Sequence, residues 1–202
     1  MSRQITAALL VGGRSTRMGR DKASLSLGGS PVLASLVTRL MPLCVGGVIV
    51  VKRSDQELPE LPEACRVEED VFEDCGALGG LHAALARAET PWVFAAACDM
   101  PLLSSDLVAW MRDYSPGTQQ VIVPVRGGFL EPLHALYHVD CLAPVETALR
   151  SGRRRMDSWL DSVRVERIEE NSWRGVHPSG DSFRNVNRPA DLERVVKAVA
   201  TR

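Results

Sequence analysis

A glycine-rich, basic segment follows the first apolar run of the chain and is well suited to bind an anion. The run covers residues 5–11, has no helical period and is short enough for a buried strand. Gly12 and Gly13 come directly after it, and glycine lets backbone N–H groups approach an anion closely because it has no Cβ atom. The segment also carries positive charge that suits a polyphosphate. Its cations are Arg14, Arg17, Arg20 and Lys22.

Two common phosphate-binding motifs do not account for this segment. A Walker loop requires Gly-Lys followed by Ser or Thr, and here Lys22 follows Asp21. The dinucleotide fingerprint requires three closely spaced glycines that open directly into a helix, and Gly12, Gly13 and Gly19 do not fit. A solvated basic loop is the alternative to a phosphate site. The coincidence of glycines, cations and a strand end favours the phosphate site.

Asp99 is a second candidate because of where it lies in the chain. It follows the buried apolar run 92–97, so we expect it at the carboxyl end of a strand, where α/β sheets bind ligands. Its carboxylate offers the hard oxygen that Mg²⁺ prefers, and Mg²⁺ normally accompanies a triphosphate. A helix-capping or turn aspartate is the alternative.

The predicted elements alternate between strand and helix through the first half. This order predicts an α/β fold with a mostly parallel sheet and helices on both faces. The second half has more strand–strand neighbours, so we expect one antiparallel strand there. The predicted strands cover 5–11, 47–51, 66–70, 92–97, 121–124, 133–138 and 164–168, and the predicted helices cover 32–40, 78–88, 104–111, 141–149 and 189–199.

Composition limits the function classes. The 202 residues suit one sizeable domain, and a net charge of −1 gives no general attraction to nucleic acid or an anionic membrane. No apolar run approaches the roughly 20 residues that cross a bilayer, and the start lacks a signal peptide, so we expect a cytoplasmic protein. Five cysteines without a Cys-x-x-Cys pair argue against a disulfide framework and a zinc site. An aromatic content of 5% argues against a base-stacking platform.

Five motifs occur in an order that resembles the molybdenum cofactor guanylyltransferase family of nucleotidyltransferases. They read LVGGRSTRMGRDK at 10–22, GALGG at 76–80, ACDMP at 97–101, EPLHALY at 131–137 and NVN at 185–187. The resemblance extends from Ala8 to Leu192. It implies a single-domain, three-layer α/β/α Rossmann-like fold over residues 1–202. In that fold, 1–103 would bind the nucleotide and 104–202 the pterin substrate.

The resemblance also implies a reaction. The family transfers GMP from GTP to the phosphate of molybdenum-bound molybdopterin and releases pyrophosphate, with Mg²⁺ as cofactor. We expect a monomer that makes transient contacts with cofactor-biosynthesis proteins and molybdoenzymes, and no nucleic-acid or membrane partner. The alternatives are a molybdopterin cytidylyltransferase, a sugar-phosphate nucleotidyltransferase and a catalytically silent nucleotide-binding adaptor.

Site roles follow from the resemblance, position by position. Lys22, Asp99 and Arg17 would be catalytic, and Asp99 would bind the metal. The residues matching the family's GTP site are Leu10, Val11, Gly12, Gly13, Lys22, Lys52, Asp70, Gly79 and Asp99. Those matching its pterin site are Glu131, His134, Arg153, Arg154, Asn185 and Asn187. Val11 stands where the family usually has alanine and Lys52 where it has asparagine, and both departures bear on the choice of base.

Several second-half residues keep two interpretations. The cluster Arg153–Arg155 follows a predicted helix end. It would either interact favourably with the helix dipole or bind the phosphate of an anionic pterin. Asn185 and Asn187 would bind the pterin, complete the metal shell or cap the last helix. His134 and His138 have the spacing of a helical metal pair. They follow a proline in an extended stretch, which favours a structural or substrate-contact role.

Overall fold

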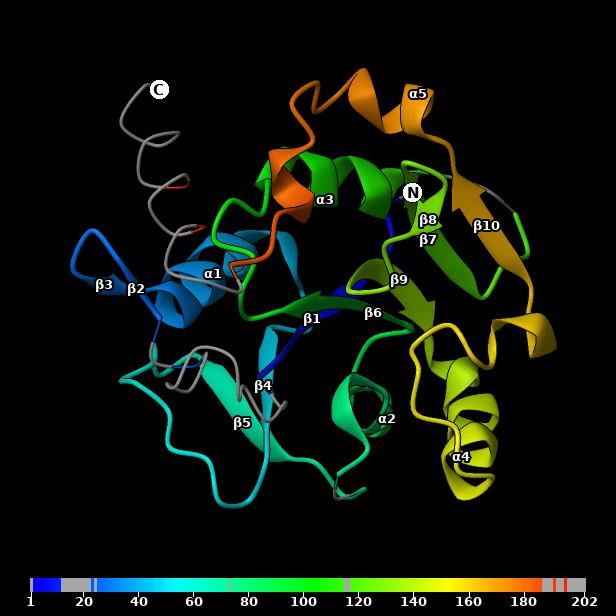
Figure 1. The fold of residues 1–202 in the computed structure, drawn as a ribbon, viewed down its shortest axis with the longest axis horizontal. Helices are drawn as coiled ribbons and strands as arrows, with labels where there is room; N and C mark the ends of the chain where they lie inside the picture. Colours follow the sequence, from blue (N-terminus) through cyan, green and yellow to red (C-terminus); the bar gives the residue numbers. More distant parts are fainter. Residues whose placement is uncertain are drawn as a thin grey trace.

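An eight-stranded sheet forms the centre of the computed structural model, which describes residues 2–11, 23, 25–72, 74–114, 117–186, 191 and 195 (Figure 1). Its path runs through β10 (Val165–Ile168), β7 (Val121–Arg126), β9 (His134–His138), β6 (Trp92–Ala97), β1 (Ile5–Leu10), β4 (Val48–Lys52) and β5 (Cys65–Glu69), with β8 (Phe129–Leu130) paired to β7. Along this path β9 is antiparallel to both neighbours, and the other pairs are parallel. The predicted mostly parallel sheet with an antiparallel strand in the second half is confirmed.

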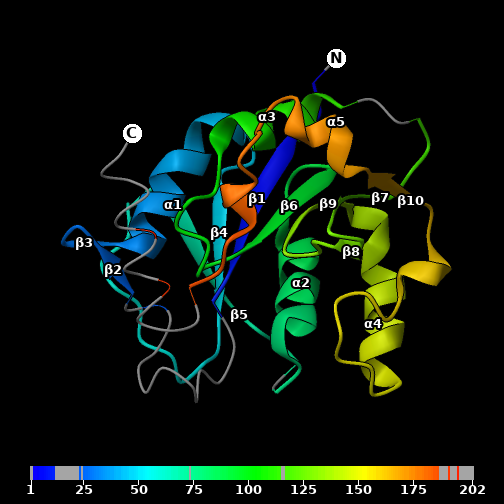
Figure 2. The ribbon, with the colours of Figure 1, turned by 45° about the horizontal axis from the view of Figure 1, so that its top comes forward.

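Helices cover both faces of the sheet, as Figure 1 and Figure 2 show. One face packs against α1 (Val32–Leu40), α3 (Ser105–Asp113) and α5 (Glu170–Arg174), and the other against α2 (Gly76–Arg87) and α4 (Leu142–Arg150). The described short 3₁₀ segments are η2 (Met41–Leu43), η3 (Val139–Cys141), η4 (Leu160–Ser162) and η5 (Asp181–Phe183). The predicted three-layer α/β/α fold is therefore confirmed.

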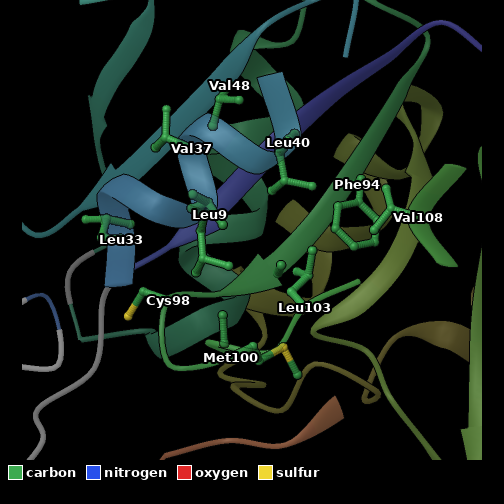
Figure 3. Packing of buried hydrophobic residues seen from close by; sticks show 14 of the residues in the cluster. Leu9, Leu33, Val37, Leu40, Val48, Phe94, Cys98, Met100, Leu103 and Val108 are labelled. Atoms are coloured by element: carbon green, nitrogen blue, oxygen red, sulfur yellow. The ribbon is translucent and has the colours of Figure 1, made fainter. Parts of the chain in front are cut away.

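The two cores are built by the alternation of side chains along the central strands. Leu9 and Phe94 point to the α1 and α3 face, where they pack with Leu33, Leu40 and Val108 (Figure 3). The intervening residues of the same strands point to the α2 and α4 face. Strands buried on both faces read as continuous apolar runs, which is why residues 5–10 and 92–97 show no alternation in sequence.

Most predicted elements occur within a few residues of their expected bounds. Ser104 caps α3 by accepting a hydrogen bond from the main-chain N–H of Leu107 at 3.3 Å. The strand expected to end at Pro124 continues to Arg126, because the chain there turns back into β8. The helix expected over 189–199 lies outside the described residues, apart from Asp191 and Val195.

Paired glycines make two tight hairpins. Gly127 and Gly128 have φ values of +56° and +80° in the turn between β7 and β8. Gly28 and Gly29, with φ values of +60° and +85°, join two short strands that the sequence analysis did not anticipate. These are β2 (Ser26–Leu27) and β3 (Ser30–Pro31).

The sheet runs without a break from the first half of the chain into the second. Antiparallel pairing between β6 and β9 joins the predicted nucleotide half to the predicted pterin half. In the part of the chain that the structure describes, no helix has both the length and the apolar character needed to span a bilayer.

Candidate functional site

The carboxyl ends of β1 and β6 lie side by side at the point where the strand order reverses. From β1 the chain proceeds outward to β4 and β5, and then returns to place β6 on the opposite side of β1. Leu10 is in register with Ala97, and the N–H of Cys98 donates to the carbonyl of Leu10 at 3.4 Å. Open α/β sheets bind ligands in the crevice outside such a reversal. In the sequence the glycine-rich segment follows β1, and Asp99 follows β6.

Asp99 connects this point to the second half of the chain. Its side chain is 3% exposed, and its main-chain carbonyl accepts a hydrogen bond from the N–H of Val186 at 2.8 Å. Asn185, the neighbouring residue, is exposed. Figure 2 shows the segment after α5 running past α3 toward the carboxyl ends of β1 and β6. Two residues nearly ninety positions apart are thus fixed to each other at the candidate site.

The Asp99 carboxylate is a suitable ligand for Mg²⁺. Mg²⁺ is typically held by one or two carboxylates together with substrate phosphates and water. Among the described residues there is no cluster of three or more His, Cys, Asp or Glu side chains that could hold a metal ion. A site built from Asp99 and phosphate oxygens fits this donor set.

The predicted phosphate segment itself lies outside the described residues, and with it Gly12, Gly13, Arg17 and Lys22. The residues that precede and follow it are described. Val11 and Ala23 are both buried in the core that packs against α1 and α3. The residues on either side of the segment therefore lie in the same core.

Gln56 contacts Val11, the residue before this segment, and the sequence alone did not indicate this role. The N–H of Val11 donates to the carbonyl of Val51 at 2.9 Å, and the carbonyl of Val11 accepts from Nε2 of Gln56 at 3.3 Å. Gln56 is only 4% exposed. No local pattern distinguishes it from other loop glutamines, because its role depends on a residue far away in sequence.

Lys52 closes the loop that carries Gln56. Its Nζ donates to the carbonyls of Ser54 at 3.3 Å and Gln56 at 3.2 Å, and lies 3.5 Å from the Glu69 carboxylate. The ammonium group therefore supports the loop beside Val11. Its expected contact with the nucleoside stays a prediction.

Asp70 and Gly79 meet at the edge of the same crevice. The N–H of Asp70 donates to the carbonyl of Lys52 at 2.8 Å, and its Oδ1 accepts from the N–H of Phe72 at 2.9 Å. Burial raises the pKa of the Asp70 carboxyl, and the Phe72 hydrogen bond offsets part of this rise. A Cβ atom at Gly79 would lie 2.6 Å from Oδ2 of Asp70, so glycine at this position lets the carboxylate lie directly against α2.

Glu131 and Asn185 share a cavity on the α1 and α3 face of the sheet. The cavity has a volume of about 710 Å³ and is open to solvent on one side. Glu131 pairs there with Arg126, with 2.6 Å between its Oε1 and the arginine Nε. The lining residues are Arg126, Glu131, Phe183, Arg184, Asn185, Asp191 and Val195. Two residues of the predicted pterin site are thus brought together, while Asn187 lies outside the described residues.

His134 has a structural environment. It is fully buried, its Nε2 lies 2.8 Å from Oγ of Ser182, and its ring contacts those of Phe94 and Phe183 at centroid distances of 5.2 and 4.7 Å. Burial lowers its pKa to about 4. The main-chain N–H of Ser104 also donates to Ser182, so His134 helps to hold η5 against the start of α3.

The predicted arginine cluster lies apart from the cavity that contains Glu131 and Asn185. Arg154 donates to the carbonyl of Leu149 at 3.0 Å, which caps the end of α4, and Arg153 donates to the carbonyl of Ser158 at 2.9 Å. Arg155 forms two hydrogen bonds to Asp157. These contacts fit the helix-end interpretation of the cluster.

Side-chain alternation along β7 explains why the cluster Arg153–Arg155 lies apart from the cavity that contains Glu131 and Asn185. Arg155 lines a second cavity of about 770 Å³ together with Val125 and Met156, whereas Arg126, the next residue of β7, lines the first cavity with Phe183. Successive residues of a strand point to opposite faces of a sheet. Met156 belongs to the core against α4, and Phe183 to the core against α3. The two cavities therefore lie on opposite faces.

Comparison with known proteins identifies the family of this chain. Residues 7–167 match the family model described as a MobA-like NTP transferase domain. A relative from Pelotomaculum thermopropionicum named probable molybdenum cofactor guanylyltransferase is 33% identical over 189 residues, which cover 94% of this chain and 90% of the relative. A Yersinia pestis protein named molybdenum cofactor guanylyltransferase is 31% identical over 196 residues, covering 96% and 95% of the two chains.

A solved structure has the same fold. The crystal structure of molybdopterin-guanine dinucleotide biosynthesis protein A from Archaeoglobus fulgidus superposes with a TM-score of 0.80 at 24% identity, over 98% of this chain and 100% of that one. The family match covers the central sheet from β1 to β10. The chain therefore belongs to the nucleotidyltransferase family defined by the MobA-like NTP transferase domain.

Proposed function

We propose that this nucleotidyltransferase transfers GMP from GTP to the phosphate of molybdenum-bound molybdopterin and releases pyrophosphate. Relatives at 31–33% identity that carry the name molybdenum cofactor guanylyltransferase support this choice of substrates. The product would be the guanine dinucleotide form of the cofactor.

The hydrogen bond from Val186 to Asp99 carries the proposal on the structural side. This bond fixes the second-half segment, which contains Asn185, against the end of β6. We expect the triphosphate and Mg²⁺ to bind there. A transferase of this kind must bring two anionic substrates to one point with their reacting atoms aligned. The geometry supplies one meeting point for residues from both halves of the chain.

The nucleotide would occupy the crevice at the ends of β1, β4 and β5. Leu10 and Val11, with the glycines that follow, would form the phosphate side, and Asp70 and Gly79 would border the nucleoside. Lys52 would support the nucleotide site indirectly, by stabilising the loop whose Gln56 contacts Val11. It would also contact the nucleoside directly. The raised pKa of Asp70 suits a carboxyl that gains hydrogen-bond donors when a ligand binds.

The reaction needs little general-base catalysis. An oxygen of the acceptor phosphate, already ionised near neutral pH, forms a bond to the α-phosphorus of GTP. The bond from that phosphorus to the bridging oxygen of the β-phosphate breaks, and pyrophosphate carries away the electron pair. Mg²⁺ bound by Asp99 would supply charge neutralisation at the transferred phosphate. Lys22 and Arg17 would stabilise the charge that builds as the bonds change.

The acceptor would approach from the second half of the chain, beside Glu131 and Asn185, with Asn187 as a further contact. Their cavity lies on the face of the sheet that packs against α3. A monomeric state, transient contacts with cofactor-biosynthesis proteins and molybdoenzymes, and a cytoplasmic location stay predictions from the sequence.

A single product analysis tests the proposal. The protein is incubated with Mg²⁺, molybdopterin and one of GTP, CTP, ATP or UTP, and the pterin product is identified by mass. We expect a GMP adduct and pyrophosphate from GTP. A CMP adduct would overturn the guanine assignment, and no adduct from any nucleotide would overturn molybdopterin as the acceptor.

A further inference from the structure

The cavity beside Glu131 contains two arginines that the sequence analysis did not single out. Arg126 lies at the end of β7, and Arg184 follows η5. The chain brings them together from positions that are far apart in sequence, and both line the cavity of about 710 Å³ with Asn185. This cavity adjoins the segment that is hydrogen-bonded to Asp99 through Val186.

Each of these arginines pairs with a carboxylate through the Nε atom of its guanidinium group. The Nε of Arg126 donates to Oε1 of Glu131 at 2.6 Å, and the Nε of Arg184 lies 3.1 Å from Oδ1 of Asp181. Among the described residues, no hydrogen bond from an Nη atom of either arginine to a protein acceptor is present. The planar Nη1–Nη2 edge, which binds a phosphate through two parallel hydrogen bonds, is therefore available on both.

The segment that carries Arg184 is fixed at several points. Ser182 contacts both Ser104 and His134, and the buried Phe183 ring packs on Trp173 at a centroid distance of 4.9 Å. Arg126 places its guanidinium carbon 5.7 Å from the centroid of the Phe183 ring. The two cations are thus positioned before any ligand binds, which reduces the entropic cost of binding.

The cluster Arg153–Arg155 differs in the use of its guanidinium groups. Nη1 of Arg153 and Nη1 of Arg154 donate to main-chain carbonyls, and Arg155 gives both Nε and Nη2 to Asp157. The cluster also lies on the other face of the sheet from Asn185.

We propose that Arg126 and Arg184 form the cation pair that receives the phosphate of the acceptor substrate, and that Arg153–Arg155 stabilise the end of α4. The assignment rests on the proposed function, in which the acceptor is a phosphate monoester. Glu131 and Asp181 then act as positioning residues that orient the two guanidinium groups toward the ligand.

The test compares three sets of variants of the full chain. The first removes the proposed pair, as R126Q, R184Q and the double variant. The second is the triple variant R153Q/R154Q/R155Q. The control is R150Q, because Arg150 also pairs with a carboxylate, Glu146 at 2.6 Å, but lies on the exposed surface of α4. Melting temperature and circular dichroism establish that each variant is folded.

Two readouts are measured for each variant. Calorimetric titration with molybdopterin, without GTP, reports acceptor binding in the absence of turnover. Steady-state assays report KM for molybdopterin and for GTP separately. We expect each single substitution in the first set to weaken molybdopterin binding roughly tenfold or more, with GTP binding nearly unchanged. Salt should weaken molybdopterin binding to the wild type and have less effect on the double variant.

The outcomes separate the two proposals. Wild-type protein that binds molybdopterin but forms no dinucleotide would refute the proposed function and leave the cation pair testable by titration. Unchanged molybdopterin binding by a folded R126Q/R184Q variant would refute the pair. A loss of acceptor binding confined to the Arg153–Arg155 variant would instead assign the phosphate to that cluster. Partial recovery in R126K, which keeps the charge but not the planar edge, would support bidentate contact.

Discussion

The Asp70 carboxylate lies so close to Gly79 that a side chain at residue 79 would have to displace it. A Cβ atom there would lie 2.6 Å from Oδ2 and 2.8 Å from Oδ1 of Asp70. Gly79 belongs to the first part of α2, and Asp70 follows β5. The glycine therefore sets the distance between the helix and a carboxylate at the edge of the proposed nucleotide crevice.

The substitution G79A tests this contact. Alanine within a helix normally adds about 1 kcal/mol of stability relative to glycine, so a loss of function here would not come from weak helix formation. We expect the Asp70 side chain to be displaced and GTP binding, measured by calorimetry, to weaken roughly tenfold. The control is G80A, because its Cβ would meet the Leu10 side chain at 3.3 Å and not Asp70. Equal GTP affinity in G79A and wild type would remove Asp70 from the nucleotide site.

D99N tests the proposed metal ligand. The amide is similar in size but is a poorer ligand for Mg²⁺, so turnover should fall about a hundredfold or more while the fold persists. The measurement is product formation against Mg²⁺ concentration, with melting temperature as the check on folding. D106N serves as control, because Asp106 is an exposed carboxylate in the first turn of α3. Wild-type turnover by folded D99N would exclude the metal role.

Q56E tests the hydrogen bond from Gln56 to Val11, the residue before the predicted phosphate segment. The substitution keeps the shape of Gln56 but removes the N–H that donates to Val11, and it places a carboxylate in a buried position. We expect the free energy of unfolding, measured in urea, to fall by about 1–3 kcal/mol and GTP binding to weaken as well. E57Q at the exposed neighbouring position should change neither quantity. Loss of stability with unchanged GTP affinity would limit Gln56 to a role in folding.

His134 predicts a pH dependence of stability. Burial is the largest cause that lowers its pKa from 6.5 to about 4 in the folded state. Between these values the unfolded chain binds a proton that the folded chain does not, so the free energy of unfolding should decrease as pH falls from about 6.5 to 4. The full effect amounts to about 3 kcal/mol.

The measurement compares urea unfolding of wild type and H134Q at several pH values. H134Q should be less stable at pH 7, because it changes a fully buried ring, but its stability should depend less on pH in this window. Taking the difference between the two proteins removes the contribution of the other titrating groups, including His82. Parallel pH profiles would show that His134 does not carry the effect.

The sequence by itself determined the order and type of the main elements. Apolar runs at 5–10 and 92–97 are long enough for buried strands and too short for helices, and the residues that follow them, glycines after β1 and Asp99 after β6, could be assigned to strand ends. The buried face of α1, from Val32 to Leu40, also follows from helical spacing alone. These features are local, so a single stretch of chain contains the information. The β2–β3 hairpin is local too, and the adjacent glycines Gly28 and Gly29 mark its turn in the sequence.

Only the tertiary structure decided which distant residues meet. The placement of β6 beside β1, the bond from Val186 to Asp99 and the contact of Gln56 with Val11 depend on crossovers and packing between segments far apart in sequence. The same holds for the two arginine groups. Arg126 and Arg184 share a cavity because β7 and the segment after η5 pack together, whereas strand alternation and the position of α4 place Arg155 on the other face. The local preference of a segment for helix or strand cannot predict such pairings. Their energy comes from surfaces that exist only once the sheet and its helices have assembled.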